Sequence, residues 1–239
     1  MKPWIELDRS PLPGSREELI LGQRGDDFII RVENTDLMTS RMSSSEEALA
    51  SMTAYRCPPT PAMRVLVGGL GMGFTTAAAL EAFPEDTEVV TAELLPKVVE
   101  WNERFYGHLA GHPLKNPRST IHIGDVGALF SQHTSHFDAI MLDVDNGPDD
   151  LTVVENQRLY GRRGLSIAQN ALRPGGVLAI WSAFRDDEFT RRLESVGFEV
   201  EFKGVRAHKG RGQKHFIWFA QKPGGATRRP LPSSSSQDE

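Results

Sequence analysis

The segment that decides the fold is RVLVGGLGMGFT, residues 64–75. An apolar run typical of a buried strand leads into a glycine-rich turn, and the Ala-rich stretch after it is typical of a helix. Glycine lets the backbone turn tightly and lets a ligand approach bare main chain, and the start of a helix presents unpaired N–H groups. We therefore predict that Gly69, Gly71 and Gly73 bind a cofactor. A tight strand-to-helix connection without a ligand is the alternative.

Short apolar runs alternate with helical patterns along the rest of the chain. The expected strands are residues 64–67, 88–92, 120–123, 137–142, 177–181, 198–202 and 215–220, and the expected helices are residues 74–83, 95–106, 160–172 and 187–196. Alternation at this spacing predicts an α/β fold with a doubly wound, mostly parallel sheet that is covered by helices on both faces. The last two strands flank the glycine-rich residues 204–212 and could pair as an antiparallel hairpin.

Three regions are expected along the chain. Residues 1–60 form a small β-rich N-terminal segment, in which residues 27–33 alternate like a strand, followed by a linking helix. Ser44 and Glu47 have the spacing of a capping box, and the helix should end before Cys57. Residues 61–222 form the main domain. Residues 223–239 lack apolar anchors and are expected to be disordered.

Composition limits the classes of function. Of 239 residues, 39% are hydrophobic and 25% are charged, as in an ordinary globular protein. A single cysteine excludes an intramolecular disulfide, and the first residues resemble no secretory signal, so we expect a cytoplasmic protein without a membrane span. The net charge of −5 argues against nonspecific nucleic-acid binding and suits a cationic or neutral small substrate.

Two weaker patterns carry no function in this interpretation. His108 and His112 have a metal-ligand spacing, but glycines and a proline interrupt the helix that would align them, and we expect no metal site. The basic residues between 203 and 214 are expected to form a solvated hairpin, and contact with an anionic substrate or RNA is the alternative.

Acidic residues end two of the expected strands. Glu93 lies twenty residues after Gly73, where a doubly wound fold places the carboxylate that accepts hydrogen bonds from a ribose diol. Asp125, next to Val126, follows another strand and could accept a hydrogen bond from an adenine amino group, or cap the next helix. The glycine spacing lacks the longer turn that holds a pyrophosphate. We therefore predict S-adenosylmethionine (AdoMet) or its decarboxylated form as cofactor, bound by the three glycines, Glu93, Asp125 and Val126.

The acidic centre of the sequence is FDAIMLDVDNGPDD, residues 137–150. A buried strand delivers Asp143 to the carboxyl edge of the sheet, where open α/β sheets bind their ligands. Asp145 lies two residues further and shares its face if the backbone stays extended. Paired carboxylates can bind a cationic amine or deprotonate an ammonium, so we predict Asp143 and Asp145 as catalytic. The turn at Gly147-Pro148 could fold a loop over them, and a solvated loop is the alternative.

Five stretches together resemble the spermidine synthase family within the Rossmann-like AdoMet-dependent methyltransferases. They are VLVGGLGMGFT, VVTAELLPKVVEWNERFYG, IHIGDV, FDAIMLDVDNGPD and LRPGGVLAIWSA, within residues 36–222. The resemblance implies a seven-stranded sheet with an antiparallel last strand and a homodimer. It also implies that Glu93 binds the ribose, that Asp125 binds the adenine and that Asp143 activates the attacking amine.

The sequence departs from this family at three motifs. Spermidine synthases have an Asp within the glycine turn, a Tyr-His-Glu cluster and an Asp-Ser-Ser-Asp loop, where this chain has GGLGMG, Ser45-Glu46-Glu47 and DVDN. These departures favour a transferase that moves a methyl group to a small amine or similar nucleophile. Aminopropyl transfer from decarboxylated AdoMet is the alternative, and a noncatalytic protein that binds nucleoside or RNA is the second.

Overall fold

A computed structural model describes residues 3–13, 15–33, 35–41, 43–143, 158–208 and 211–224, with the backbone alone at 207, 208 and 211–213. Three sequence predictions fall outside these ranges: the role of Asp145, the loop at Gly147-Pro148 and the disorder of the tail after residue 224.

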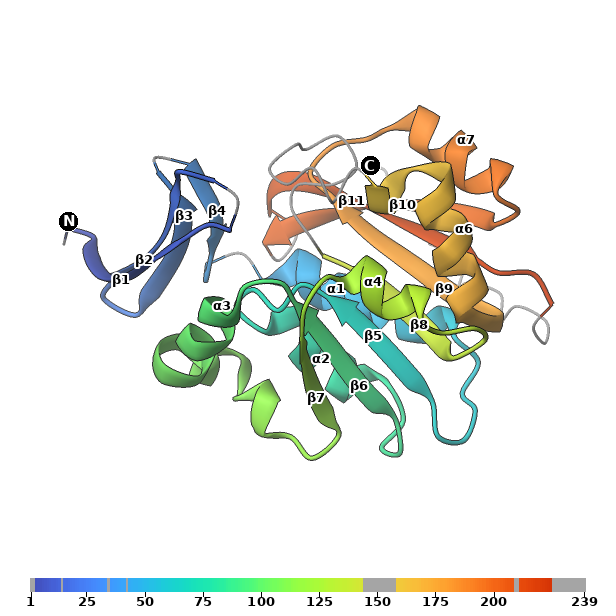
Figure 1. Ribbon diagram of the computed structural model, residues 1–239, viewed down its shortest axis with the longest axis horizontal. Coiled ribbons are helices and arrows are strands. Elements are labelled where there is room, and N and C mark those ends of the chain that lie inside the picture. The colour runs from blue at the N-terminus through green and yellow to red at the C-terminus, as the bar shows by residue number, and fades with distance from the viewer. Residues whose placement is uncertain are drawn as a thin grey trace, which may run out of the picture.

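A four-stranded antiparallel sheet begins the chain (Figure 1). Its strands, in spatial order, are β1 (Ile5–Pro11), β2 (Glu18–Arg24), β3 (Asp27–Val32) and β4 (Thr35–Thr39). Helix α1 (Ser44–Arg56) then leads to the main sheet. The capping box predicted at Ser44 is wrong, because Ser43 is the N-cap and its side chain makes no cap hydrogen bond. The helix ends before Cys57, as predicted.

The main sheet has seven strands in the order β10-β11-β9-β8-β5-β6-β7. The strands are β5 (Arg64–Gly68), β6 (Glu88–Glu93), β7 (Ser119–Ile123), β8 (Phe137–Leu142), β9 (Leu172–Ser182), β10 (Glu199–His208) and β11 (Arg211–Gln221). Strand β11 runs antiparallel to both of its neighbours, and the other pairings are parallel. This confirms the predicted doubly wound, mostly parallel fold, with the hairpin at its end.

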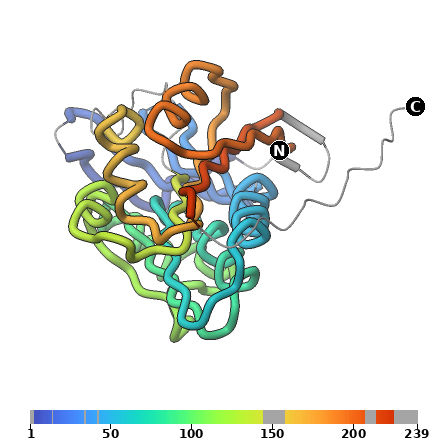
Figure 2. The backbone as a smooth tube through the Cα atoms, turned by 90° about the vertical axis from the view of Figure 1, so that its right-hand side faces the viewer, coloured from blue at the N-terminus to red at the C-terminus, as the bar shows by residue number. Residues whose placement is uncertain are grey.

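Helices cover both faces of this sheet. They are α2 (Phe74–Ala82), α3 (Pro96–Trp101), α4 (Val126–Ser131), α6 (Arg162–Ala171) and α7 (Asp187–Ser195). Apolar residues of α1 and α2 join one buried cluster, and those of α4, α6 and α7 join another. Figure 2 separates the two layers, with α1 in blue on one side of the sheet and α6 in gold on the other. No helix within the described ranges is long and apolar enough to cross a membrane.

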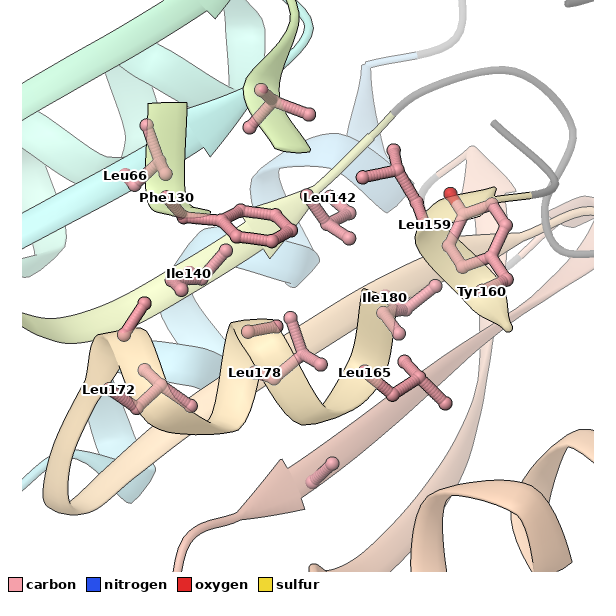
Figure 3. Close-up of a cluster of buried hydrophobic side chains, with 14 of the residues drawn as sticks. Leu66, Phe130, Ile140, Leu142, Leu159, Tyr160, Leu165, Leu172, Leu178 and Ile180 are labelled. Atoms are coloured by element: carbon pink, nitrogen blue, oxygen red, sulfur yellow. The ribbon is translucent and has the colours of Figure 1, made fainter. Parts of the chain in front are cut away.

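The core between the main sheet and helices α4 and α6 stabilises the strands that end at the candidate site. Leu66 and Ile140, from adjacent parallel strands, pack with Phe130 of α4 and Leu165 of α6 (Figure 3). These side chains are at most 1% exposed. Full burial of a large apolar side chain contributes about 1.5–3 kcal/mol to folding, so these contacts stabilise the two strands that lead to the site.

The helix predicted over residues 95–106 is not continuous. The α-helical part ends at Trp101, and a π-helical turn, η1 (Asn102–Tyr106), follows, before two 3-10 turns, η2 (Gly107–Ala110) and η3 (Pro113–Lys115). Buried Asn102 donates from Nδ2 to the carbonyl of Met72 at 3.2 Å. The irregular turn η1 therefore stabilises the glycine-rich segment through this hydrogen bond.

The small sheet docks on the main domain of its own chain. Phe28 meets Tyr106 edge to face with 6.0 Å between ring centroids, and Trp101 donates from Nε1 to Asp8 at 2.9 Å. Both contacts border one buried cluster that joins β2, β3, the glycine turn and α3. The small sheet therefore buries apolar side chains against the main domain of the same chain. The homodimer stays a prediction.

Candidate active site

The glycine turn is built from left-handed backbone. Gly71 has φ +49° and Gly73 has φ +90°, a region that side-chain-bearing residues rarely adopt. A Cβ at Gly71 would lie 3.0 Å from the Met38 side chain, and one at Gly73 would lie 3.0 Å from Pro113. Gly71 therefore allows β4 to approach the turn. Gly73 allows η3 to approach it.

Glu93, at the carboxyl end of β6, clamps this turn. Its Oε2 accepts from the Leu70 N–H at 3.0 Å and its Oε1 accepts from the Leu95 N–H at 2.8 Å. The residue is 8% exposed, and burial raises the pKa of its carboxyl against the lowering effect of the backbone donors. Each oxygen has a further lone pair, so the carboxylate can support the turn and still accept from a ribose hydroxyl.

Asp125 caps helix α4. Its Oδ1 accepts from the Ala128 N–H at 2.6 Å, which is the capping role named as the alternative. This leaves the second carboxylate oxygen for an adenine amino group, so the two roles are compatible. Val126 is 5% exposed and packs into the core.

An apolar surface lies beside these two acids. Glu93 pairs in register with Ile123 on β7, and Ile123 is 50% exposed, while Leu94 is 46% exposed. Exposed large apolar side chains at the ligand-binding edge of a sheet suit the face of a purine base.

Asp143 follows β8 directly. Its N–H donates to the Gly68 carbonyl at 2.9 Å, which extends the pairing of β8 with β5 and fixes the backbone at the point where the strand order reverses. Its Oδ2 accepts from the Thr75 hydroxyl, on the first turn of α2, at 2.7 Å. Burial raises the pKa of the carboxyl from 3.8 to about 6, and the Thr75 hydrogen bond opposes this shift. A carboxylate with a raised pKa can take a proton near neutral pH.

Asp143 opens onto a cavity of about 120 Å³ between the small sheet and the main sheet. The lining residues are Leu37, Met38, Glu46, Gly69, Leu70, Gly71, Met72, Phe74, Thr75, Asp143 and Trp181. Among them are two carboxylates and no basic side chain. The cavity brings together three of the predicted site residues, Gly69, Gly71 and Asp143. The others, Gly73, Glu93, Asp125 and Val126, do not line it.

Glu46 and Trp181 are among the lining residues that sequence reasoning missed. Trp181 lies near the carboxyl end of the buried strand β9, so the rule that drew attention to Asp143 would also have found it. Glu46 lies in the first turn of α1, and nothing local in the sequence says that this turn packs beside the glycine turn. In the part of the chain that the structure describes, no group of His, Cys, Asp and Glu is placed to hold a metal ion.

The strand order and the glycine turn are those of the class I AdoMet-dependent methyltransferase-like fold. No protein-family model matches the chain. A polyamine aminopropyltransferase of Nitrosomonas europaea is 31% identical over 122 residues, which is 50% of this chain and 35% of that protein. The match therefore spans about a third of the relative's length.

Solved structures share the fold at low identity. The crystal structure of spermidine synthase from Thermotoga maritima has a TM-score of 0.72 at 17% identity, over 91% of this chain and 72% of that one. A spermidine synthase in complex with the transition-state analogue AdoDATO has a TM-score of 0.72 at 16% identity, over the same shares. A probable spermidine synthase from Corynebacterium glutamicum has a TM-score of 0.65 at 13% identity, over 90% and 79%. The predicted resemblance is thus confirmed, and by fold the chain is spermidine synthase-like.

Proposed function

We propose that the chain is a transferase that moves the aminopropyl group of decarboxylated AdoMet to a primary amine. The observation that carries this proposal is the acidic lining of the cavity at Asp143, without a basic side chain among its described residues. Aminopropyl transfer is the alternative of the sequence analysis. The main expectation, methyl transfer, is not confirmed, and the names of the relatives favour the alternative.

The lining fits a decarboxylated donor better than AdoMet itself. The side chain of AdoMet ends in an ammonium and a carboxylate, whereas the decarboxylated side chain ends in an ammonium alone. A carboxylate in a small cavity with two others would be repelled, and an ammonium would be attracted. Glu93, the remaining oxygen of Asp125 and the apolar edge at Leu94 and Ile123 would hold the adenosine part.

The chemistry then needs few protein groups. The lone pair of the acceptor nitrogen attacks the aminopropyl carbon next to the sulfonium sulfur, and the carbon–sulfur bond breaks with its electrons on sulfur. The products are a neutral thioether, 5′-methylthioadenosine, and an ammonium that loses one proton. In this proposal Asp143 accepts that proton and orients the amine, with Thr75 holding its carboxyl in place.

Thermal unfolding with each donor tests the proposal. A ligand at 100 times its dissociation constant stabilises a protein by about 2.7 kcal/mol. Decarboxylated AdoMet should raise the melting temperature at lower concentration than AdoMet does. Stabilisation by AdoMet alone would contradict aminopropyl transfer and favour methyl transfer. Stabilisation by neither compound would contradict a sulfonium donor at this site.

A further inference from the structure

Glu46 has a buried carboxylate oxygen that no described residue satisfies. Its Oε2 is shielded from solvent and has no hydrogen-bond partner among the described residues, and the side chain lines the cavity. The Nε1–H of Trp181, on the same lining, is likewise buried without a partner among those residues. More than nine in ten buried polar groups in proteins are satisfied, and an unsatisfied one costs about 1–3 kcal/mol, more for a charge. Glu46 Oε2 is an acceptor and the Trp181 N–H is a donor, so an ammonium, which only donates, would satisfy Glu46 alone. The orphaned carboxylate oxygen therefore indicates a ligand that donates.

We propose that Glu46 binds the ammonium group of a primary alkylamine in this cavity and thereby selects ligands with a free amine and no carboxylate. The assignment of that amine to the sulfonium donor or to the acceptor rests on the function proposed above. The role of Glu46 toward an ammonium rests on the cavity itself.

The charged groups around Glu46 are negative, so they favour binding of a cation. Burial raises the pKa of the Glu46 carboxyl first, and the negative charges of Asp143 and Glu47 raise it further. His215, which shares a contact at 3.1 Å with Ser45 and meets the Trp181 ring, supplies no positive charge at neutral pH because burial lowers its pKa. An ammonium within the cavity would relieve the repulsion between the Glu46 and Asp143 carboxylates and allow both to ionise.

The size of the cavity matches a short alkyl chain. A volume of 120 Å³ corresponds to about four water molecules. An aminopropyl group has a comparable number of non-hydrogen atoms. The apolar side chains of Leu37, Met38 and Phe74 on the lining suit its methylene groups, and the carboxylates suit its charged end.

Calorimetry on Glu46→Gln tests the proposal, with Glu194→Gln as the matched control. Glu194 lies on α7, is exposed and does not line the cavity, so its variant makes the same change of charge away from the site. Three ligands are titrated into each protein. Decarboxylated AdoMet carries the aminopropyl group, 5′-methylthioadenosine is the same nucleoside without it, and 1,4-diaminobutane is an amine without a nucleoside.

The expected result is that Glu46→Gln weakens binding of one or both amines at least tenfold, with the affinity for 5′-methylthioadenosine within twofold of wild type and all affinities of Glu194→Gln unchanged. Loss for the sulfonium ligand alone assigns Glu46 to the donor, and loss for the diamine alone assigns it to the acceptor. Affinities of Glu46→Gln within twofold of wild type for both amines overturn the proposal, as does wild-type protein that binds neither. If 5′-methylthioadenosine does not bind the wild-type protein, the proposed nucleoside site is refuted. The affinity of 1,4-diaminobutane for wild type and Glu46→Gln then still tests whether Glu46 binds an ammonium.

Discussion

Replacing Asp143 with Asn should make the protein more stable and the enzyme much slower. Burial raises the pKa of this carboxyl from 3.8 to about 6. About two pKa units correspond to an ionisation penalty on the order of 3 kcal/mol in the folded state. Asn carries no charge, and its side-chain oxygen can still accept from Thr75, so the variant should keep the fold and lose the penalty.

The sign of this effect depends on pH. Above about pH 6 Asp143 is ionised in both the folded and the unfolded chain, so the penalty is fully present. As the pH falls from 6 toward 4 the folded chain takes up a proton first, and the penalty disappears. The stability advantage of Asp143→Asn should therefore reach about 2–3 kcal/mol at pH 8 and vanish near pH 4.

Urea unfolding at these two pH values measures the stability, and steady-state turnover measures the chemistry. A general base contributes about 10²–10⁴-fold, so turnover should fall by that factor, while the affinity for 5′-methylthioadenosine stays within a few-fold. Glu194→Gln, which removes an exposed acid on α7, is the control and should change neither quantity. Wild-type turnover in Asp143→Asn would refute its role as base, and equal stability at pH 8 would refute the burial argument.

Four further predictions concern the same edge and the assembly. Glu93→Gln should weaken binding of 5′-methylthioadenosine by about 1.5–3 kcal/mol in calorimetry, since a charge-assisted hydrogen bond to the ribose is lost, and unchanged affinity contradicts the assignment. Thr75→Val removes the hydrogen bond that lowers the pKa of Asp143, so the acidic limb of the pH–rate profile should move to higher pH, and an unmoved limb argues against this coupling. Binding of decarboxylated AdoMet at pH 5.5 should release protons, because the cation favours ionised Asp143, and equal heats in two buffers of different ionisation enthalpy would contradict this. Light scattering at micromolar concentration should give a dimer mass, and a monomer mass would refute the homodimer.

The main sheet was predictable because its signals are local and strong. The run before Gly68 is continuously apolar, as buried parallel strands are, and the glycines after it need left-handed backbone that other residues rarely adopt. Glu93 and Asp143 were found by the rule that ligands bind at the carboxyl ends of parallel strands. Their positions follow from the end of each strand alone.

The missed features depend on contacts between distant segments. Helix α4 has only six residues, too few for its apolar period to be recognised, and the core that holds Phe130 stabilises it. The ligand contact predicted for Gly73 stays a prediction, but its close approach to Pro113 and Asn102, forty and twenty-nine residues away in the sequence, could not be foreseen. Glu46 enters the cavity only because α1 packs against the main sheet, which no pattern within residues 43–50 reveals.

The most direct test of the account is the product formed from decarboxylated AdoMet and 1,4-diaminobutane by the full chain, identified by mass spectrometry. The account predicts an amine heavier by one aminopropyl group and 5′-methylthioadenosine in equal amount, both strongly reduced in Asp143→Asn. An amine heavier by one methyl group, formed when AdoMet is supplied instead, or no product from any donor while the donors bind, would contradict it.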